Sequence, residues 1–277
     1  MKSYTIDENG IKLFEKRQVS TAFTSKAQEG LMQIEDNSWW FKYRAFFIKT
    51  IAEKYLDKSK RIYDIGGGNG YTSSKMMRNG WRASLIEPTY EACLNAKSRG
   101  LDEVICGEVT QETVEDAYFE QAMLLDVLEH IENDKEFLML IRKKLKINGR
   151  LLITVPAFEE LWSSEDDAAG HFRRYTIEGL SKVAKQAGFK IITINYFFGF
   201  LYVPIKIVRH YGEKIGLLKP YEKRSEYERE RVNQSQFRSR KGIVDFVLKK
   251  LEKHEIRKII SGKRLRRGSS IILVLER

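Results

Sequence analysis

The 277-residue chain has 42% hydrophobic and 31% charged residues and a formal net charge of +11, which suits one elaborated globular domain, or one domain with a subdomain. No apolar run reaches the roughly 18 residues of a membrane span, and the polar first ten residues predict no signal peptide. The two cysteines, Cys93 and Cys106, have no metal-site spacing and no evident disulfide pattern, so a reducing cytoplasm is the expected setting.

From residue 61 onward, strand-like segments alternate with helix-like ones, which predicts an α/β fold with a mainly parallel sheet. The predicted strands are Arg61–Ile65, Ala83–Ile86, Glu103–Cys106, Gln121–Leu125, Gly149–Val155, Lys190–Tyr196 and Ser270–Leu275. The main predicted helices between them are Tyr90–Arg99, Asp134–Leu145 and Thr176–Ala187. The predicted division is a helical segment at 1–60, a core at 61–197, a basic helical cap at 198–268 and the last core strand at 269–277.

The first predicted strand leads into a glycine-rich turn at residues 64–70, Asp-Ile-Gly-Gly-Gly-Asn-Gly. Because glycine lacks a Cβ, the backbone at Gly66, Gly68 and Gly70 is able to approach a nucleotide-like ligand closely. The spacing is G-x-G-x-G, which differs from the G-x-G-x-x-G of dinucleotide-binding proteins. Asp64, just before the first glycine, suits a cationic or amine-bearing ligand and would repel a pyrophosphate.

This turn resembles the first motif of the class I methyltransferases that use S-adenosylmethionine (SAM). The resemblance implies that Asp64, Gly66, Gly68 and Gly70 bind SAM and that S-adenosylhomocysteine leaves as the product. It also implies a Rossmann-like sheet of seven strands with helices on both faces, in which the seventh strand runs antiparallel beside the fifth. An ordinary strand-to-helix turn without a ligand is the alternative.

Two further acidic positions follow predicted strands. Glu87, followed by Pro88, ends the second strand 19 positions after Gly68. A carboxylate there accepts hydrogen bonds from ribose hydroxyls in dinucleotide folds, and the resemblance implies the same for SAM. Glu108 and Val109 follow the third strand, where the resemblance implies an acidic residue near the adenine amino group and an apolar side chain on the ring. A solvent-facing acid is the alternative at both positions.

The fourth predicted strand is followed by Asp-Val-Leu-Glu-His at residues 126–130, which resembles the D-x-L-E-H motif of a broad methyltransferase group. The resemblance implies that Asp126 and Val127 contact the cofactor, at the strand end where open α/β sheets bind ligands. It places His130 on the methyl side, so we predict a catalytic role for His130, with a structural histidine as the alternative. The segment lacks the D/N-P-P-Y/F signature of enzymes that methylate base amino groups, which counts against a nucleic-acid substrate.

Residues 170–176, Gly-His-Phe-Arg-Arg-Tyr-Thr, resemble a motif of a bacterial methyltransferase subgroup. His171 is a candidate general base, because imidazole titrates near neutral pH. Arg173 and Arg174 are candidates for clamping a phosphate or carboxylate of the acceptor, and Tyr175 is assigned to the same substrate site. The alternative is that His171 and the two arginines only brace the loop before the next helix.

Residues 37–44, Asn-Ser-Trp-Trp-Phe-Lys-Tyr-Arg, resemble the W-W-F-x-x-R helix that precedes the core in the same subgroup. Aromatic clusters on helices are most often part of a core, so packing is the expected role. A contact of Tyr43 or Arg44 with the cofactor is the alternative.

About 70 residues separate the last two predicted strands, far more than a loop requires. They comprise an apolar run at 197–205, a helix candidate at Lys206–Lys214, a charged stretch at Lys219–Lys241, an amphipathic helix at Ile243–Ile260 and a basic turn at Lys263–Arg267. Residues 205–277 hold 21 Lys or Arg and 9 Asp or Glu, so the net positive charge of the chain lies entirely in this quarter. The charge predicts an anionic partner: a phosphorylated substrate, a nucleic acid or a membrane surface. The alternative is a helical surface that is only solvated.

These motifs together predict a SAM-dependent methyltransferase that transfers a methyl group to oxygen on a small or lipid-linked acceptor, such as a sugar or a polyprenyl molecule. The basic cap predicts peripheral contact with an anionic membrane at its cytoplasmic, inner face. No metal is expected. A nucleic-acid (RNA) methyltransferase and a non-catalytic SAM-binding protein are the alternatives.

Overall fold

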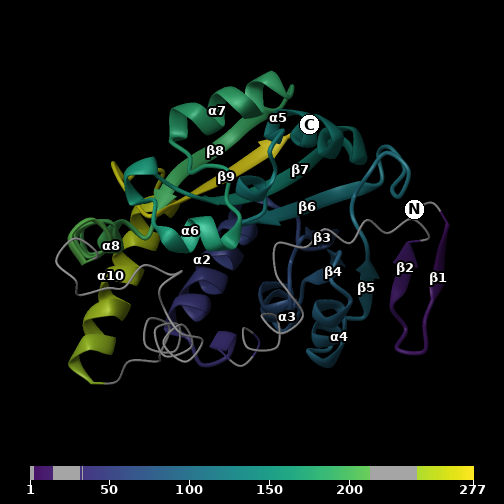
Figure 1. The fold of residues 1–277 in the computed structure, drawn as a ribbon, viewed down its shortest axis with the longest axis horizontal. Coiled ribbons are helices and arrows are strands. Elements are labelled where there is room, and N and C mark those ends of the chain that lie inside the picture. The colour runs from purple at the N-terminus through teal and green to yellow at the C-terminus, as the bar shows by residue number, and fades with distance from the viewer. Residues whose placement is uncertain (1–2, 15–31, 33, 213–241) are drawn as a thin grey trace.

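The computed structural model describes residues 3–14, 32, 34–212 and 242–277. Strands in these residues form one sheet with the order β1-β2-β5-β4-β3-β6-β7-β9-β8 (Figure 1). The strands are β1 (Tyr4–Ile6), β2 (Lys12–Phe14), β3 (Arg61–Ile65), β4 (Arg82–Glu87), β5 (Glu103–Cys106), β6 (Phe119–Leu125), β7 (Leu145–Pro156), β8 (Lys190–Phe197) and β9 (Ser270–Glu276). The helices are α2 (Trp39–Tyr55), α3 (Tyr71–Met77), α4 (Tyr90–Ser98), η1 (Leu128–His130), α5 (Asp134–Lys144), η2 (Glu159–Leu161), α6 (Ser164–Ala169), α7 (Ile177–Gln186), α8 (Gly199–Gly212) and α10 (Ile243–Ile260).

The seven strands predicted from the sequence form the main part of the sheet. Strands β5, β4, β3, β6 and β7 run parallel, and β9 lies antiparallel between β7 and β8. The α/β fold with an antiparallel last strand is therefore confirmed. The strand order reverses at β3, which lies between β4 and β6, and this is the position where open α/β sheets form a ligand crevice.

Two short strands extend the sheet at its other edge, where the sequence predicted only helix in residues 1–60. Strands β1 and β2 pair antiparallel, and β2 pairs parallel with β5. Lys12 lies 2.5 Å from the carboxylate of Glu103, and Phe14 is buried against Gly107, where a Cβ would lie 2.5 Å from its ring. Strands of three residues are too short to show an alternating pattern, so this pair could not be predicted from the sequence.

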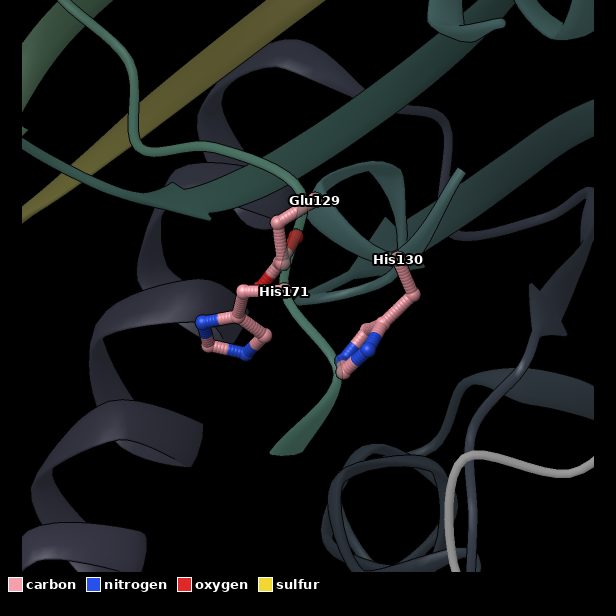
Figure 2. Close-up of side chains that lie close together, drawn as sticks. All are labelled: Glu129, His130 and His171. Carbon is pink, nitrogen blue, oxygen red and sulfur yellow. The ribbon is translucent and has the colours of Figure 1, made fainter. Parts of the chain in front are cut away.

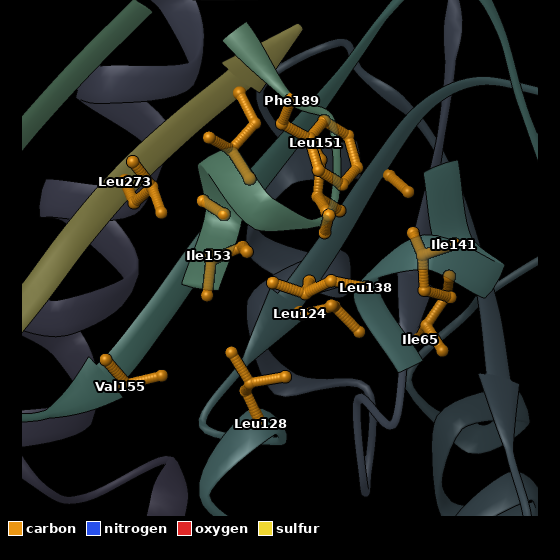
Figure 3. Packing of buried hydrophobic residues seen from close by; sticks show 14 of the residues in the cluster. Ile65, Leu124, Leu128, Leu138, Ile141, Leu151, Ile153, Val155, Phe189 and Leu273 are labelled. Carbon is orange, nitrogen blue, oxygen red and sulfur yellow. The ribbon is translucent and has the colours of Figure 1, made fainter. Parts of the chain in front are cut away.

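The two faces of the sheet carry separate cores, because side chains alternate along each strand. On β7, Leu151, Ile153 and Val155 point into a cluster that α5 and α7 cover (Figure 3). Leu152 lies on the opposite face, in a cluster that contains residues of α2, α3 and α10. Helices thus cover both faces, as predicted.

Helices α8 and α10 stand between β8 and β9 in the chain, as the predicted insertion requires. The bounds of α10 equal those predicted, whereas α8 begins at Gly199, earlier than the predicted start at Lys206. The apolar run at 197–205 covers both the end of β8 and the first half of α8. Because the run is apolar throughout, the start of the helix could not be recognised in the sequence. The predicted charged stretch Lys219–Lys241 lies outside the described residues.

The cap joins the core through a buried glutamate of α10. The carboxylate of Glu255 accepts hydrogen bonds from the hydroxyl of Tyr43 on α2 (2.9 Å) and from the N–H groups of Phe198 (2.8 Å) and Gly199 (2.6 Å). Glu255 therefore fixes the start of α8 relative to α2. None of the helices described combines the length and the hydropathy needed to cross a bilayer.

Candidate active site

A cavity of about 1410 Å³ lies at the carboxyl ends of β3, β4, β5 and β6, where the switch in strand order places a ligand crevice. Helix α2, the loop before and after α6, and helix α8 complete its walls. The sequence-predicted site residues in its lining are Asp64, Gly66, Gly68, Glu87, Pro88, Glu108, Val109, Asp126, Val127, His130, His171 and Arg174. Gly70, Arg173 and Tyr175 lie outside the lining.

The glycine turn after β3 requires glycine for two different reasons. Gly66, Gly68 and Gly70 have φ of +72°, +55° and +69°, a region that other residues rarely adopt. A Cβ on Gly66 would lie 2.8 Å from a methyl group of Val127, whereas no atom of the described residues lies within 4 Å of the Cβ position at Gly68. The backbone at Gly68 thus faces open space in the cavity, and Gly70 forms the N-cap of α3.

Asp64 lies beneath this turn with a carboxylate oxygen that has no internal partner. The side chain is 1% exposed, and one oxygen accepts a 2.7 Å hydrogen bond from the hydroxyl of Ser73. The other oxygen, Oδ1, has no hydrogen-bond partner in the described residues. Burial raises the pKa of Asp64 to about 6, and the Ser73 hydrogen bond opposes this rise. A buried acceptor of this kind suits an amine donor on a bound ligand.

Glu87 stands at the end of β4 with its carboxylate held by backbone. Oε2 accepts from the N–H of Gly68 and Oε1 from the N–H of Thr89, both at 3.0 Å. Burial raises the pKa of Glu87, and these hydrogen bonds oppose the rise. A carboxylate has about four acceptor sites, so Glu87 retains acceptor capacity toward the cavity that it lines together with Pro88.

Glu108 and Val109 follow β5 on the same wall. Val109 is buried and Glu108 is half-buried, and burial raises the pKa of Glu108. Gly107 precedes them with φ of +149° and contacts Phe14 of β2. The N-terminal strand pair thus supports the loop in which the sequence predicted the adenine contact.

Asp126, directly after β6, is held by a buried arginine from α2. Its Oδ2 lies 2.8 Å from the guanidinium of Arg44, and its Oδ1 accepts a 2.9 Å hydrogen bond from the hydroxyl of Thr154. Arg44 also donates to Thr154 at 3.1 Å and lies 5.5 Å from the ring of Trp40. Asp126 adopts φ of +58°, which this network stabilises. Arg44 therefore lines the cavity and orients Asp126, beyond the packing role expected for its helix.

The end of the cavity past Asp126 contains three side chains that converge: Glu129, His130 and His171 (Figure 2). The rings of His130 and His171 are 4.7 Å apart at 74°, although 41 positions separate the two residues in the chain. Burial and the neighbouring His171 lower the pKa of His130 to about 4. Burial and the charge of Asp126 raise the pKa of Glu129 well above its usual range. No role was predicted for Glu129, although it lies within the same D-x-L-E-H motif as His130.

A second residue without a predicted role, Asp166 of α6, orients His171. Its Oδ1 is 2.8 Å from Nδ1 of His171 and accepts a 2.8 Å hydrogen bond from Nε of Arg174. Oδ2 lies 3.4 Å from Arg209 of α8 and accepts from Ser163, which closes the capping box of α6. Burial raises the pKa of Asp166, but the His171 hydrogen bond and the charges of Arg174 and Arg209 hold this pKa well below its usual range.

The three residues predicted to bind the acceptor have different positions. Arg174 reaches the cavity but is paired with Asp166 at 2.7 Å. Arg173 lies 3.1 Å from Asp134, and the hydroxyl of Tyr175 donates to the same carboxylate at 2.9 Å. For Arg173 this contact is of the kind that the bracing alternative describes, and Tyr175 shares the same partner. Acceptor binding by these side chains stays a prediction.

The sequence of this chain matches a known protein family and several known proteins. Residues 39–194 match a family model described as a methyltransferase domain, and the chain belongs to this family. The mitochondrial ubiquinone biosynthesis O-methyltransferase of Schizosaccharomyces pombe is 32% identical over 116 residues, which cover 39% of this chain and 42% of that protein. The ubiquinone biosynthesis O-methyltransferase of Rickettsia felis is 26% identical over 114 residues, 39% of this chain and 47% of that protein. The match therefore spans less than half the length of these two relatives.

Solved structures share the fold at low identity. Phosphoethanolamine N-methyltransferase 2 of Haemonchus contortus, in complex with phosphomonomethylethanolamine and S-adenosylhomocysteine, has a TM-score of 0.58 at 15% identity, covering 93% of this chain and 59% of that chain. The [4+2]-cyclase SpnF has a TM-score of 0.58 at 16% identity, covering 95% and 99%. At these identities the likeness shows the fold alone. Together with the family match, this likeness shows that the chain has the fold of a methyltransferase domain, as its motifs predict.

Proposed function

We propose that this methyltransferase transfers the methyl group of SAM to a hydroxyl oxygen of a small, mainly apolar acceptor, which includes lipid-linked molecules. The observation that carries the proposal is one continuous cavity that joins the glycine turn and Glu87 to the pair His130 and His171. The names of the relatives above, which specify O-methylation in ubiquinone biosynthesis, support oxygen as the methylated atom.

One half of the cavity, the cofactor half, binds SAM and orients it. Backbone at Gly68 faces open space, Asp64 offers an unpaired buried oxygen for the ammonium group, and Glu87 offers acceptors for ribose hydroxyls. Glu108 and Val109 take the adenine end, and Asp126 with Val127 separates this half from the acceptor. SAM supplies the reactive sulfonium, so the protein has to align the acceptor oxygen with the methyl group and exclude water.

The acceptor half combines aromatic walls with polar side chains at one end. Trp39, Trp40 and Phe41 of α2 line one wall, and Leu201 and Ile205 of α8 line the other. These walls suit an apolar ring or chain, whereas His130 and His171 suit the hydroxyl that has to lose its proton. We therefore place the acceptor hydroxyl beside the two histidines.

We also propose that α10 contacts an anionic membrane at the inner, cytoplasmic face, where a lipid-linked acceptor would be found. Phe246, Val247 and Leu251 are exposed on α10, at spacings that put them on one side of the helix with Lys250. Lys250 lies 4.5 Å from the ring of Phe246. Exposed aromatic and basic side chains on one helix face are typical of interfacial helices. Full-length protein should co-sediment with phosphatidylglycerol vesicles at low salt, and absence of co-sedimentation would remove the membrane contact.

The test of the proposed reaction is incubation of the full-length protein with methyl-labelled SAM and a panel of acceptors. The panel contains catechols, polyprenylated phenols, sugars and RNA, and calorimetry with S-adenosylhomocysteine measures cofactor binding independently. We expect label on a hydroxyl of an apolar phenol. Label in RNA alone would support the nucleic-acid alternative, and cofactor binding without label on any acceptor would support the non-catalytic one.

A further inference from the structure

Glu129, His130 and His171 form a compact set of metal-ligand side chains at the acceptor end of the cavity. One nitrogen from each histidine and one carboxylate oxygen of Glu129 all lie within 4.8 Å of one another. Figure 2 shows the three side chains converging from two different segments, η1 after β6 and the loop after α6. The backbone holds the segments together, because the N–H of Phe172 donates to the carbonyl of Glu129 at 2.8 Å.

Glu129 supplies an independent sign that this end of the cavity binds a cation. Its side chain is 1% exposed and contributes to the cavity lining, yet its Oε2 has no hydrogen-bond partner in the described residues. An unpaired buried carboxylate oxygen is costly, and proteins normally pair such a group or coordinate it to a metal. Arg44 and Arg174, the buried arginines nearby, are bonded to Asp126 and Asp166 and not to Glu129.

His171 has the supporting contact that metal-bound histidines usually show. Its Nδ1 lies 2.8 Å from Oδ1 of Asp166, so Nε2 is left for a ligand. A carboxylate on the second ring nitrogen fixes the tautomer and the ring orientation, and strengthens the histidine as a ligand. Asp166 is itself held by Arg174 and Ser163, so the ring of His171 is fixed before any ligand binds.

We propose that Glu129, His130 and His171 bind one divalent first-row transition-metal ion, of the Zn²⁺, Co²⁺ or Mn²⁺ class. Two imidazoles and one carboxylate are a donor set that such ions prefer, whereas Mg²⁺ prefers oxygen ligands and retains its waters. Three protein ligands leave coordination positions open toward the cavity. The set could not be recognised in the sequence, because the two histidines are 41 positions apart.

The role of the ion rests on the proposed O-methylation. An acceptor hydroxyl coordinated to the ion loses its proton to solvent more readily, because a bound cation lowers the pKa of the hydroxyl. The resulting oxygen anion forms a bond to the methyl carbon of SAM while the sulfur–methyl bond breaks, and S-adenosylhomocysteine leaves. In this scheme both histidines act as ligands, and neither has to take the proton.

The site is tested with full-length protein that has been dialysed against a chelator and then titrated with Co²⁺ and with Zn²⁺. We expect a visible Co²⁺ absorption band that saturates at about one ion per chain, as the three-ligand site predicts. Glu129→Gln and His171→Asn should each weaken Zn²⁺ binding by about 100-fold or more, and Asp166→Asn by about 10- to 100-fold. His254→Asn, on the exposed side of α10, is the matched control and should bind the ion as the unchanged chain does.

Two outcomes would overturn the site: absence of a saturable Co²⁺ band in the unchanged protein, or a band that survives in both Glu129→Gln and His171→Asn. Methylation that is undiminished in the chelated protein would overturn the catalytic role of the ion while leaving O-methylation intact. Saturable metal binding without methylation of any hydroxyl would support the site and overturn the proposed reaction. Calorimetry with S-adenosylhomocysteine on the chelated protein shows whether the cofactor half remains folded.

Discussion

Asp64 should make cofactor binding depend on pH in a defined direction. Burial raises the pKa of this carboxyl to about 6, and its Oδ1 has no internal partner. In the proposed binding mode, we expect the ionised form to accept a hydrogen bond from the ammonium group of the cofactor and the protonated form to lose the charge attraction. With a pKa near 6, about 90% of the carboxyl is ionised at pH 7 and about 10% at pH 5. S-adenosylhomocysteine should therefore bind up to about tenfold more weakly at pH 5 than at pH 7.

Asp64→Asn should remove most of this dependence and weaken binding at pH 7. A hydrogen bond to a charged group contributes about 1.5–3 kcal/mol, which corresponds to about 10- to 150-fold in Kd. Calorimetry with S-adenosylhomocysteine at pH 5, 6 and 7 measures both effects. The pKa of Glu87 is also raised, so the profile of Asp64→Asn serves as the baseline that isolates Asp64. Asp102→Asn, at an exposed position after α4, is the matched control.

A Kd that does not change between pH 5 and pH 7 in the unchanged protein would refute this reasoning. So would Asp64→Asn with the affinity of the unchanged protein. Either result would mean that the buried carboxylate only supports the turn through Ser73 and that the ammonium group finds its partner elsewhere.

Three further substitutions test the framework of the site. Gly66→Ala combines φ of +72° with a Cβ 2.8 Å from Val127, so urea unfolding should show a loss of about 1–3 kcal/mol. Arg44→Met leaves Asp126 without its 2.8 Å ion pair, and urea unfolding should show a loss of about 1–3 kcal/mol with weaker S-adenosylhomocysteine binding. Glu255→Gln weakens the charge-assisted acceptor at the start of α8, so amide hydrogen exchange in α8 should become faster.

Each of these variants has a control at a less constrained position. Gly100 also has positive φ, +89°, but no atom in the part of the chain that the structure describes lies within 4 Å of its Cβ position, so Gly100→Ala isolates backbone strain. Arg82 and Glu53 are exposed, and Arg82→Met and Glu53→Gln remove the same groups from the surface. Gly66→Ala that costs no more than Gly100→Ala would contradict the steric argument. If Arg44→Met destabilised the protein no more than Arg82→Met, the argument about the ion pair with Asp126 would be contradicted. If Glu255→Gln changed the exchange in α8 no more than Glu53→Gln, the argument about the start of α8 would be contradicted.

The cofactor half could be predicted from the sequence because its parts are local. The turn at residues 64–70 can be recognised from the local sequence alone, because an acidic residue and the glycines directly follow one another at the end of a predicted strand. Glu87 and Asp126 were found in the same way, each as a polar residue directly after an apolar strand. In a parallel sheet these strand ends come together without further information, so local pattern was sufficient.

The acceptor half could not be predicted to the same extent, because it depends on contacts between distant segments. Asp166 is an ordinary acid of a short helix until the fold places it beside His171 and Arg209. Glu129 gave no sign in the sequence that it would be buried with an unpaired oxygen. The sequence also could not show that one of the two adjacent arginines predicted to clamp an anion, Arg173, has an internal ion-pair partner in Asp134.

Asp166 connects α8 of the cap to His171 at the acceptor end of the cavity. Oδ1 of Asp166 fixes His171, and Oδ2 lies 3.4 Å from Arg209, which α8 of the cap supplies. The other end of α8 is fixed to α2 by Glu255, and α2 supplies Arg44 to Asp126. A displacement of α8 that admits an acceptor must therefore strain or break the contact between Arg209 and Asp166, while Arg174 still holds the carboxylate. Such a displacement would act first on His171, whereas Asp64 keeps its contact with Ser73 and Glu87 keeps its contacts with Gly68 and Thr89.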